Sequence, residues 1–397
     1  TNGADNEAEK GGVEGSVPLE EPKPKETPRL LGAQPARVIM HVPGQGVRPF
    51  SFSQVFDGES NQERIFDKCA RPAIVSVLNG LNACVLCYGQ TGSGKTHSAF
   101  GPPNAIEGAV GVRADSGVVV RMLEEVIRGT ESQSKMCGLK TVVSAQYVEI
   151  YNDAVTDLLT GDPCDVSRGT GALLNAVESP VTSLEAGLRL LRVGQVRKRF
   201  AETAMNSRSS RAHTIFMLHV RQTRGDSMIS SCLQMVDLAG SERVKKSKAT
   251  GARFTEAVGI NESLMILGKV ILALVESRSH VPYLESKLTT LLRRALGGAS
   301  RTSVIVCCRQ DDAQAEETLQ ALQFAERCAL VTNLKQQSDV SSAADALKAI
   351  DATISTCKAS MESLQKRELT HLTTFKQLED RTRQLMLRRR ALADVVE

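Results

Sequence analysis

Short runs of β-branched and apolar residues alternate with longer amphipathic segments between residues 36 and 333. The runs have the length and composition of strands, whereas residues 61–79 and 183–196 repeat apolar positions with the period of a helix. Strands and helices that alternate on this scale favour an α/β fold, with a mainly parallel central sheet and helices on both faces. The predicted strands are 83–88, 140–151, 213–220, 230–238 and 301–308.

The last part of the chain has a different pattern, with no Gly and no Pro from residue 334 onward. A seven-residue repeat runs through residues 347–397, and eleven of its fifteen seam positions are apolar. This register predicts a coiled-coil neck and a homodimer through residues 347–396, preceded by a linker over 334–346. A helix that packs back on the globular domain is the alternative. The seam positions are Leu347, Ile350, Ile354, Cys357, Met361, Leu364, Glu368, His371, Phe375, Leu378, Thr382, Leu385, Arg389, Leu392 and Val396.

Residues 1–35 hold five of the thirteen prolines and many Glu and Lys residues, with little apolar periodicity. This composition predicts a disordered extension, either a plain spacer or a binding arm. Residues 36–333 would then form the folded domain. The chain has no run of 18 apolar residues and no charged start followed by an apolar stretch, so we expect neither a membrane span nor secretion.

The net charge and the cysteines limit which partners and which chemistry we expect. The formal net charge is only +4 over 397 residues, so an acidic partner must be met by local basic clusters. The ten cysteines include Cys307 and Cys308 within an apolar run, and we interpret them as reduced, buried thiols of a cytosolic protein.

A glycine-rich stretch, YGQTGSGKTHSAFG at residues 88–101, carries the clearest chemistry. It follows a predicted strand and precedes a helix, which is the setting of a loop that binds phosphate through backbone N–H groups. A lysine in such a loop reaches the β- and γ-phosphates, and the following hydroxyl ligates Mg²⁺. The predicted ATP-binding residues in the loop are Gly89, Gln90, Thr91, Gly92, Ser93, Gly94, Lys95 and Thr96.

Two further stretches fit a site that senses the γ-phosphate. In VDLAGSE, residues 236–242, Asp237 ends an apolar strand and suits a Mg²⁺ contact through water. Gly240 presents an N–H group that no side chain blocks. In NSRSSRAH, residues 206–213, hydroxyl, amide and guanidinium groups crowd one predicted loop, which can order around a phosphate.

These stretches together resemble the P-loop and the two switches of the kinesin motor domain family. YVEIYND, TAMN, GINESLMILGKVILAL, HVPYLESKLTTLLRRALGG and LQALQFAERCALVTN are similar to other kinesin motifs and occur in family order. The resemblance covers the chain from Arg37 to Asn333. It implies a Mg²⁺-dependent ATPase that moves along microtubules, and a location in the cytoplasm on the cytoskeleton.

The resemblance also implies roles for particular residues. His97 and Pro43 would flank the adenine, and Ser210 would join Thr96 and Asp237 around Mg²⁺, with Asp237 and Ser210 reached through water. The catalytic set would be Asn206, Ser209, Ser210, Arg211, Gly240 and Glu242, with Arg211 and Glu242 forming an ion pair between the switches.

A basic stretch follows directly after the second switch, so partner contact and phosphate sensing would share one loop. The resemblance implies the microtubule as that partner. Because the linker follows the domain, it also implies plus-end-directed movement. The predicted microtubule contacts are Arg243, Lys245, Lys246, Lys248, Arg253, Arg278, His280, Lys287, Arg293 and Arg294.

Some positions depart from the family pattern and keep a second function open. Met40 and Val42 stand where arginines are usual, Ala212 replaces a serine, Glu262 replaces a basic residue, and Leu284 replaces an arginine. A slow or non-motile microtubule-binding scaffold that is gated by nucleotide is therefore the alternative. A signalling GTPase or metabolic kinase is disfavoured, since no guanine-reading N-K-x-D stretch occurs.

Overall fold

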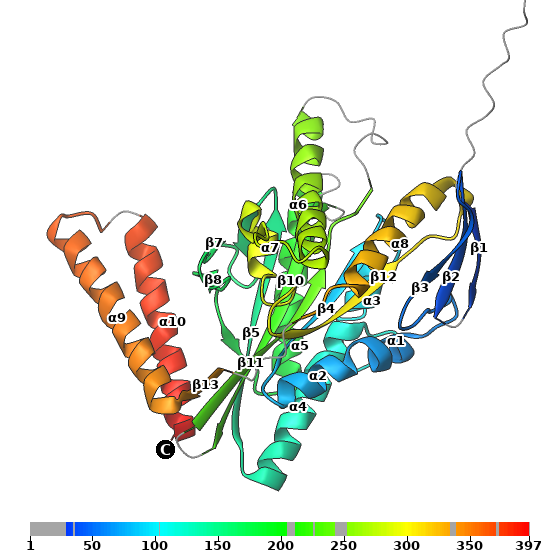
Figure 1. The fold of residues 1–397 in the computed structure, drawn as a ribbon. Coiled ribbons are helices and arrows are strands. Elements are labelled where there is room, and N and C mark those ends of the chain that lie inside the picture. Colours follow the sequence, from blue (N-terminus) through cyan, green and yellow to red (C-terminus); the bar gives the residue numbers. More distant parts are fainter. Residues whose placement is uncertain are drawn as a thin grey trace, which may run out of the picture.

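The computed structural model describes residues 29–34, 36–102, 104–204, 211–224, 227–242, 252–333, 339–370 and 373–396. In these residues a central sheet carries helices on both faces, a small sheet lies at one end, and a helical hairpin lies at the other (Figure 1). The strands of the central sheet are β4 Asn82–Gly89, β5 Lys140–Tyr151, β6 Ala154–Asp157, β7 Pro163–Val166, β8 Leu173–Leu174, β9 Ser179–Pro180, β10 His213–Arg224, β11 Ser227–Asp237, β12 Ser300–Cys307 and β13 Asp339–Ser342.

The central sheet is mixed rather than mainly parallel. Its order is β12-β4-β11-β10-β5-β6-β7-β8, with β13 paired to β11 and β9 paired to β5. Among the described strands, β4 is parallel to β12 and β11, and the other pairings are antiparallel. The reason lies in the connections, because residues 225–226 alone separate β10 from β11. Parallel neighbours need a crossover of a dozen or more residues.

Alternate side chains of each strand enter two separate cores. On β4, Val85 and Cys87 are buried against one set of helices, whereas Cys84 and Leu86 are buried against the other set. The first set is α1 Gln62–Cys69, α2 Arg71–Leu78, α3 Lys95–Phe100, α4 Val118–Cys137 and α5 Leu184–Ala204; the second set is α6 Ala252–Val275, α7 Lys287–Leu291 and α8 Ala315–Ala329, with short 3₁₀ turns at Tyr283–Glu285 and Asp312–Gln314.

The helix predicted over residues 61–79 is two helices. The first begins after Asn61, whose side chain accepts a hydrogen bond from the Arg64 N–H group at 2.9 Å, and ends at Cys69. Pro72 stands in the first turn of the second helix. Because proline has no N–H group, it cannot continue the hydrogen bonding of the first helix.

The small sheet corrects the predicted boundary of the N-terminal extension. Its strands are β1 Arg29–Gln34, β2 Arg37–Val42 and β3 Gly46–Ser51, in that order and antiparallel. Residues 29–34 therefore belong to the domain, although they lie within the range predicted to be disordered; residues 1–28 lie outside the described residues. Ala36, between β1 and β2, has a φ of 64°, so the turn uses a left-handed residue without glycine.

The small sheet also explains two departures from the family pattern. Met40 and Val42 are buried, and they pack with Phe50 of β3 and Leu322 of α8. These positions supply the core of the small sheet. Arginine there would bury an unpaired charge.

The C-terminal segment is helical but does not form the single continuous coiled-coil helix predicted from the repeat. It forms two antiparallel helices, α9 Ala343–Lys366 and α10 Thr373–Val396 (Figure 1). Glu368, a polar seam position, has a φ of 57° in the turn between them. Part of the apolar seam is thus buried within one chain: Ile350 and Ile354 are buried, and they pack with Leu385 and with Met228 of β11.

Part of the predicted linker belongs to folded elements. Residues 339–342 form β13, which pairs with residues 227–230 of β11, and residues 343–346 begin α9. Residues 334–338 lie outside the described residues. The hairpin is therefore joined to the central sheet by a strand pairing as well as by apolar contacts.

The helical hairpin predicts that the chain is a monomer. Because Ile354 is already buried within one chain, we expect a monomer by size exclusion with light scattering at micromolar concentration. Ile354→Asp should destabilise the hairpin by about 3 kcal/mol, since it buries a charge in an apolar cluster, whereas Lys358→Asp at an exposed position on the same helix should have little effect. A stable dimer would mean that the hairpin opens and that the seam pairs two chains.

All ten cysteines are free thiols, and all lie within the described residues. Cys84 and Cys87 have C-x-x-C spacing, but their side chains enter different cores, since they lie three positions apart on a strand. Cys137 is exposed, which differs from the prediction of uniformly buried thiols. In the described part of the chain, no helix combines the length and apolar character that a membrane span requires.

Candidate active site

The predicted phosphate loop connects the end of β4 to the start of α3. Gly89, Gly92 and Gly94 have φ values of 144°, 74° and 103°, which side chains rarely allow. At Gly89 a Cβ atom would lie 2.1 Å from the carbonyl oxygen of Cys307 on β12. A Cβ at Gly94 would meet no atom within 4 Å, so the need for glycine there is conformational. These glycines therefore hold the loop open in front of the N-terminus of α3.

Lys95 is buried at the first position of α3, and its Nζ atom donates to the carbonyl oxygen of Gln90 at 2.8 Å. The ammonium group thus lies inside the loop. Burial lowers the pKa of Lys95, and the nearby carboxylates of Asp237 and Glu242 oppose that shift. An anion held in the loop would remove the cost of this buried charge, which is the behaviour expected of a phosphate-binding lysine.

Thr96 and Asp237 lie together as the sequence predicted. The Thr96 hydroxyl donates to Asp237 Oδ2 at 2.7 Å. Asp237 is buried, and its Oδ1 atom has no hydrogen-bond partner among the described residues. A hydroxyl beside a buried carboxylate oxygen without a partner provides the hard oxygen ligands that Mg²⁺ prefers, so these two residues fit the predicted metal.

A buried lysine stands next to this pair and was not predicted. Lys198 Nζ lies 3.9 Å from Asp237 Oδ2 and donates to the Thr214 hydroxyl at 2.9 Å. It also lies 5.9 Å from the centre of the Phe100 ring. Lys198 lies on the same face of α5 as the buried Leu188 and Leu191, at helical spacing. A charged residue at an apolar-face position was the signal that could have found it.

The second switch meets the phosphate loop through Glu242. One of its carboxylate oxygens accepts from the Thr91 N–H group at 2.8 Å, and the other accepts from the Thr91 hydroxyl. Gly240 is buried, and a Cβ atom there would lie 2.3 Å from Thr91 Oγ1. The Ser241 N–H group donates to the carbonyl oxygen of Gly89 at 3.1 Å. The loop and the switch are thus in direct contact.

The predicted ion pair between Arg211 and Glu242 is not among the contacts of the described residues. In this conformation the carboxylate of Glu242 binds Thr91, while Arg211 has other interactions. The pairing of the two switches stays a prediction. Asn206, Ser209 and Ser210 lie outside the described residues, and Ala212 is buried.

His213 connects the switches to α6, a role that was not predicted although the residue ends the first switch motif. It is buried, and its Nδ1 atom accepts from the Ala239 N–H group at 3.0 Å. The Nε2–H group then donates to the Ser263 hydroxyl at 2.8 Å. Burial, together with the charge of Lys95, lowers the pKa of His213 to about 3.

The depressed pKa of His213 predicts a dependence of stability on pH. The folded value of about 3 lies below the usual 6.5, so the unfolded chain binds the proton more readily between those values. The stability that neutral His213 contributes is present above pH 6.5 and is lost as the pH falls toward 3. Between pH 7 and pH 5 the free energy of unfolding should fall by about 2 kcal/mol from this residue, as measured by urea denaturation. In His213→Gln, which can keep both hydrogen bonds, an equal fall would contradict the assignment.

The predicted adenine-binding residues lie on two different elements, α3 and the end of β2. His97 is exposed on α3, and Gln62 of α1 holds it: Gln62 Nε2 lies 3.1 Å from His97 Nδ1 and donates to the His97 carbonyl oxygen at 2.7 Å. Pro43 follows directly after β2 and is half-buried. Gln90 donates to Gln314 at 3.0 Å, which joins the loop to the start of α8.

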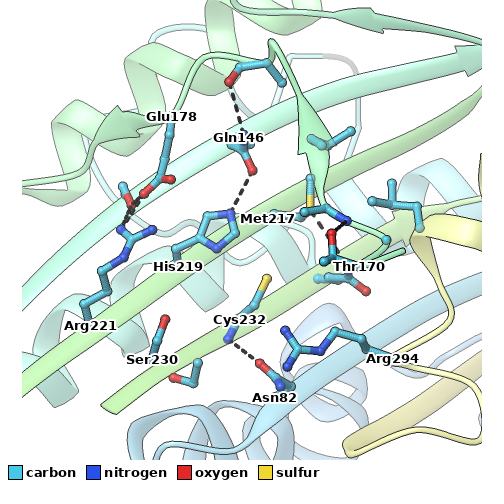
Figure 2. Close-up of a pocket in the computed structure, with 18 of the residues that line it drawn as sticks. Asn82, Gln146, Thr170, Glu178, Met217, His219, Arg221, Ser230, Cys232 and Arg294 are labelled. Carbon is cyan, nitrogen blue, oxygen red and sulfur yellow. Dashed lines mark hydrogen bonds and ion pairs between the residues drawn. The ribbon is translucent and has the colours of Figure 1, made fainter. Parts of the chain in front are cut away.

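Only part of the predicted basic surface can be described. Arg278 pairs with Glu276, Lys287 pairs with Asp165, and the guanidinium of Arg293 lies 5.6 Å from the Tyr283 ring centre. Arg294 lines a cavity over β5, β10 and β11, together with Asn82 and Cys232 (Figure 2). His280 is exposed. Arg243, Lys245, Lys246 and Lys248 lie outside the described residues, as does the side chain of Arg253.

A strand, a glycine loop and a helix that enclose a buried lysine, with a hydroxyl bonded to an aspartate on the adjacent strand, define a P-loop nucleoside-triphosphatase fold. Residues 30–331 match the family model described as "Kinesin motor domain". The chain therefore belongs to the kinesin motor domain family.

Individual relatives agree with this membership. Over 293 residues the chain is 41% identical to kinesin-like protein KIN-14C of Oryza sativa subsp. japonica, a match of 71% of this chain and 29% of that protein. Over 282 residues it is 42% identical to kinesin-like protein KIN-14O of Arabidopsis thaliana, a match of 70% of this chain and 24% of that protein. The chain thus spans less than a third of the length of these curated relatives.

A solved structure is also similar to this chain. It is described as that of a fast kinesin, and it superposes with a TM-score of 0.70 at 34% sequence identity. The match covers 79% of this chain and 88% of that chain.

Proposed function

We propose that this chain hydrolyses ATP with Mg²⁺ and that microtubules stimulate the reaction. The observation that carries the proposal is the direct contact between the phosphate loop and the second switch, through Thr91 and Glu242. A γ-phosphate bound by the loop would compete for the same groups, so its presence or loss would move the switch.

In this proposal the residues position and stabilise rather than react covalently. Lys95 would bind the β- and γ-phosphates, and Thr96 and Asp237 would hold Mg²⁺, which would supply positive charge next to the phosphates. Asn206, Ser209 and Ser210 place the attacking water. The Gly240 N–H group binds the γ-phosphate, and closure of Arg211 onto Glu242 excludes bulk water from the site.

His213 supports a route from the site to the proposed track. It binds the Ala239 N–H group in the second switch and the Ser263 hydroxyl on α6. A shift of the second switch would therefore displace α6. The exposed side chains of α6 include Glu262, Met265 and Lys269.

The proposed microtubule surface leads to a prediction with two opposite changes. Neutralising Lys245, Lys246 and Lys248 together should weaken co-sedimentation with microtubules about tenfold or more at low salt, with little change in ATP affinity, because exposed charges interact over about 10 Å at 0.1 M salt. Leu284→Arg should strengthen binding, since Leu284 is 48% exposed and lies three residues before the predicted contact Lys287. Glu262→Lys should also strengthen binding.

Arg189→Gln is the matched control, because Arg189 is exposed on α5 and α5 covers the opposite face of the sheet. Co-sedimentation that responds equally to Arg189→Gln and to the triple lysine change would place the track elsewhere.

The ATPase rate with and without polymerised tubulin tests the main proposal. Strong stimulation supports a motor. Tight, nucleotide-dependent binding with slow turnover in both conditions favours the alternative, a nucleotide-gated scaffold. No binding and no stimulation would contradict both functions.

We also propose that the chain moves along microtubules. Plus-end direction was expected from a linker that docks and detaches after the domain, and a gliding assay on polarity-marked microtubules tests it. Minus-end gliding would overturn that expectation. A dimer through residues 347–396 would require opening of the hairpin. Attachment to the cytoplasmic microtubule cytoskeleton follows from the same proposal.

A further inference from the structure

A cavity of about 630 Å³ lies on the face of the central sheet that also carries α6 and α7 (Figure 2). Side chains of β4, β5, β10 and β11 form its floor, residues 170–180 form one wall, and Arg381 and Leu385 of α10 also line it. Gln234 of the floor and Asp237 of the nucleotide site are three residues apart on β11, so their side chains point to opposite faces of the sheet. The cavity is therefore separate from the phosphate loop.

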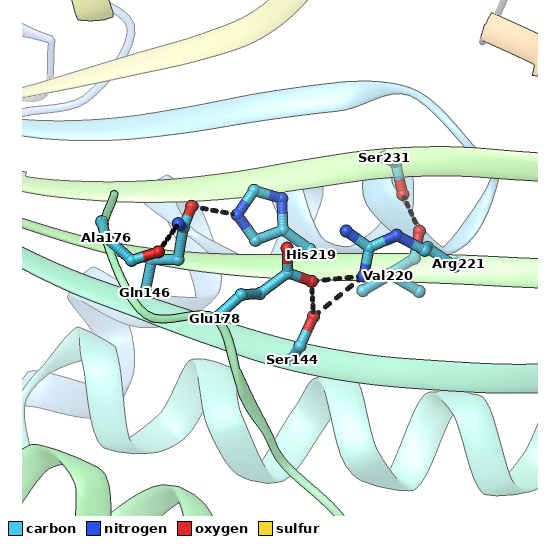
Figure 3. A network of polar contacts seen from close by, with 8 residues as sticks. All are labelled: Ser144, Gln146, Ala176, Glu178, His219, Val220, Arg221 and Ser231. Carbon is cyan, nitrogen blue, oxygen red and sulfur yellow. Dashed lines mark hydrogen bonds and ion pairs between the residues drawn. The ribbon is translucent and has the colours of Figure 1, made fainter. Parts of the chain in front are cut away.

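On the side of the floor formed by β5 and β10, the polar side chains bind one another. Arg221 is buried, and its Nη1 atom donates to the Ser144 hydroxyl at 3.0 Å and to the carboxylate of Glu178 (Figure 3). The Gln146 carboxamide likewise bridges His219, 2.9 Å away, and a backbone carbonyl group (Figure 3). Since these groups have partners and the ion pair is neutral, this side of the floor does not require a charged ligand.

The side of the floor formed by β4 and β11 differs, because two carboxamides there keep hydrogen-bonding groups that no described residue uses. Asn82 Oδ1 accepts from the Cys232 N–H group at 2.9 Å, and no described residue accepts from the Nδ2 group of Asn82. In the described part of the chain, the side chain of Gln234 makes one weak hydrogen bond, from Nε2 to the sulfur of Met217 at 3.7 Å, so its Oε1 atom has none. Asn82 and Gln234 are half-buried and line the cavity, so these groups are accessible to a ligand.

The register of the sheet places these two carboxamides next to each other. Gln234 lies opposite Cys84 of β4, and Asn82 is two residues before Cys84, so the three side chains share one face. The Cα atoms of Asn82 and Gln234 are thus roughly 8 Å apart, from the spacing of the strands and the rise of two residues. Two side chains at this separation can bind the two sides of one amide group: Asn82 Nδ2 donates to its carbonyl oxygen, and Gln234 Oε1 accepts from its N–H group.

We propose that this cavity binds a small neutral molecule that carries a cyclic amide on an apolar ring system. The amide binds between Asn82 and Gln234, and the rings lie against the apolar side chains that line the cavity, which include Leu174. A cyclic amide presents its N–H and C=O groups at one edge of a flat ring, and a cavity of this volume with apolar walls and a few placed polar groups is typical of small-molecule sites. A neutral ligand fits because Arg221 pairs with Glu178, and Arg294 also has an interaction of its own.

Three aromatic probes of similar size test the proposal on the full chain. Carbostyril is a benzo-fused cyclic amide, N-methylcarbostyril lacks its N–H group, and naphthoate carries a negative charge instead of an amide. Their dissociation constants are measured by ligand-observed NMR with saturating Mg-ADP, so that the nucleotide site is occupied. Carbostyril should bind about tenfold more tightly than its methyl analogue, because the analogue leaves Gln234 Oε1 without a donor. Tighter binding of naphthoate than of carbostyril would mean that the cavity recognises charge, and would overturn the proposal.

Two variants locate the amide. Gln234→Leu removes the acceptor, whereas Asn82→Asp removes the donor and keeps the acceptor for the Cys232 N–H group. Each should weaken binding of carbostyril about tenfold, and in Gln234→Leu carbostyril and its methyl analogue should bind equally to within about twofold. Gln45→Leu is the control, because Gln45 is exposed in the turn between β2 and β3. Equal effects of Gln234→Leu and Gln45→Leu, or no preference of the parent chain for carbostyril over its methyl analogue, would overturn the proposal.

Methionine methyl signals give a second readout that does not depend on these two variants. Met217 lies directly opposite Gln234 on β10 and lines the cavity, so the NMR signal of its isotope-labelled methyl group should shift when carbostyril is added. The signal of Met136, which is exposed on α4, should not shift. Met217→Leu and Met136→Leu assign the two signals. An unshifted Met217 signal at saturating carbostyril, or equal shifts of both signals, would overturn the proposal.

Discussion

Lys95→Ala should reduce the ATPase rate about 100-fold or more, with and without microtubules. The ammonium group of Lys95 lies inside the phosphate loop and is the one cation there that the loop itself supplies. Its removal takes away charge stabilisation of the transferring phosphate, and the loss of one such group costs about 10²–10³ in rate. The measurement is steady-state phosphate release under saturating ATP.

Lys135→Ala is the control for this prediction, since Lys135 is an exposed lysine near the end of α4. Circular dichroism of both variants should match the parent chain, because the Nζ atom of Lys95 donates a hydrogen bond to a loop carbonyl and not to a residue of the core. Turnover of Lys95→Ala within about twofold of the parent would remove the loop from the mechanism.

Glu242→Ala should bind ATP and hydrolyse it about 100-fold more slowly. Glu242 holds Thr91 of the phosphate loop through both carboxylate oxygens in this conformation, and it is the proposed partner of Arg211 when the switches close. The alanine variant can form neither the contact with Thr91 nor the ion pair with Arg211. A fluorescent ATP analogue measures binding, and single-turnover phosphate release measures hydrolysis; ATP-dependent attachment to microtubules should persist.

Glu242→Gln separates the two roles of the side chain. The amide can still accept from the Thr91 N–H group, but it cannot form an ion pair with Arg211. Hydrolysis as slow as in the alanine variant would assign the effect to the ion pair. Normal hydrolysis in Glu242→Gln would show that contact with Thr91 suffices, and normal hydrolysis in Glu242→Ala would exclude Glu242 from catalysis.

The sequence alone determined the longer strands of the central sheet and the phosphate loop. Residues 140–151 form β5 as predicted, and the other predicted strands lie within a few residues of β4, β10, β11 and β12. The phosphate loop was also predictable, because its glycines are required by the backbone angles of the loop itself. Such features depend on the order of neighbouring residues, which the sequence gives directly.

The tertiary structure decided how these elements combine. The seven-residue repeat predicted helix in residues 347–396, but not which surface the apolar seam would meet; α9 and α10 meet each other and Met228. An apolar stripe can be buried equally well against a second chain or against another helix of the same chain, so the periodicity of the sequence does not distinguish the two arrangements. Residues 29–34 were likewise predicted to belong to a disordered extension, whereas in the structure they pair with β2 as a strand.

The sequence also could not show which distant residues meet at the nucleotide site and at the cavity. Thr96 was expected beside Asp237 because both belong to known motifs, whereas Lys198 reaches Asp237 only because α5 packs beside β11's neighbour β10. The cavity that Arg294 and Arg381 both line also joins segments far apart in the chain. The sequence by itself determined the phosphate loop and the elements around it. Contacts between distant segments were decided by the tertiary structure, because they depend on how whole faces pack and not on the residues beside them in the chain.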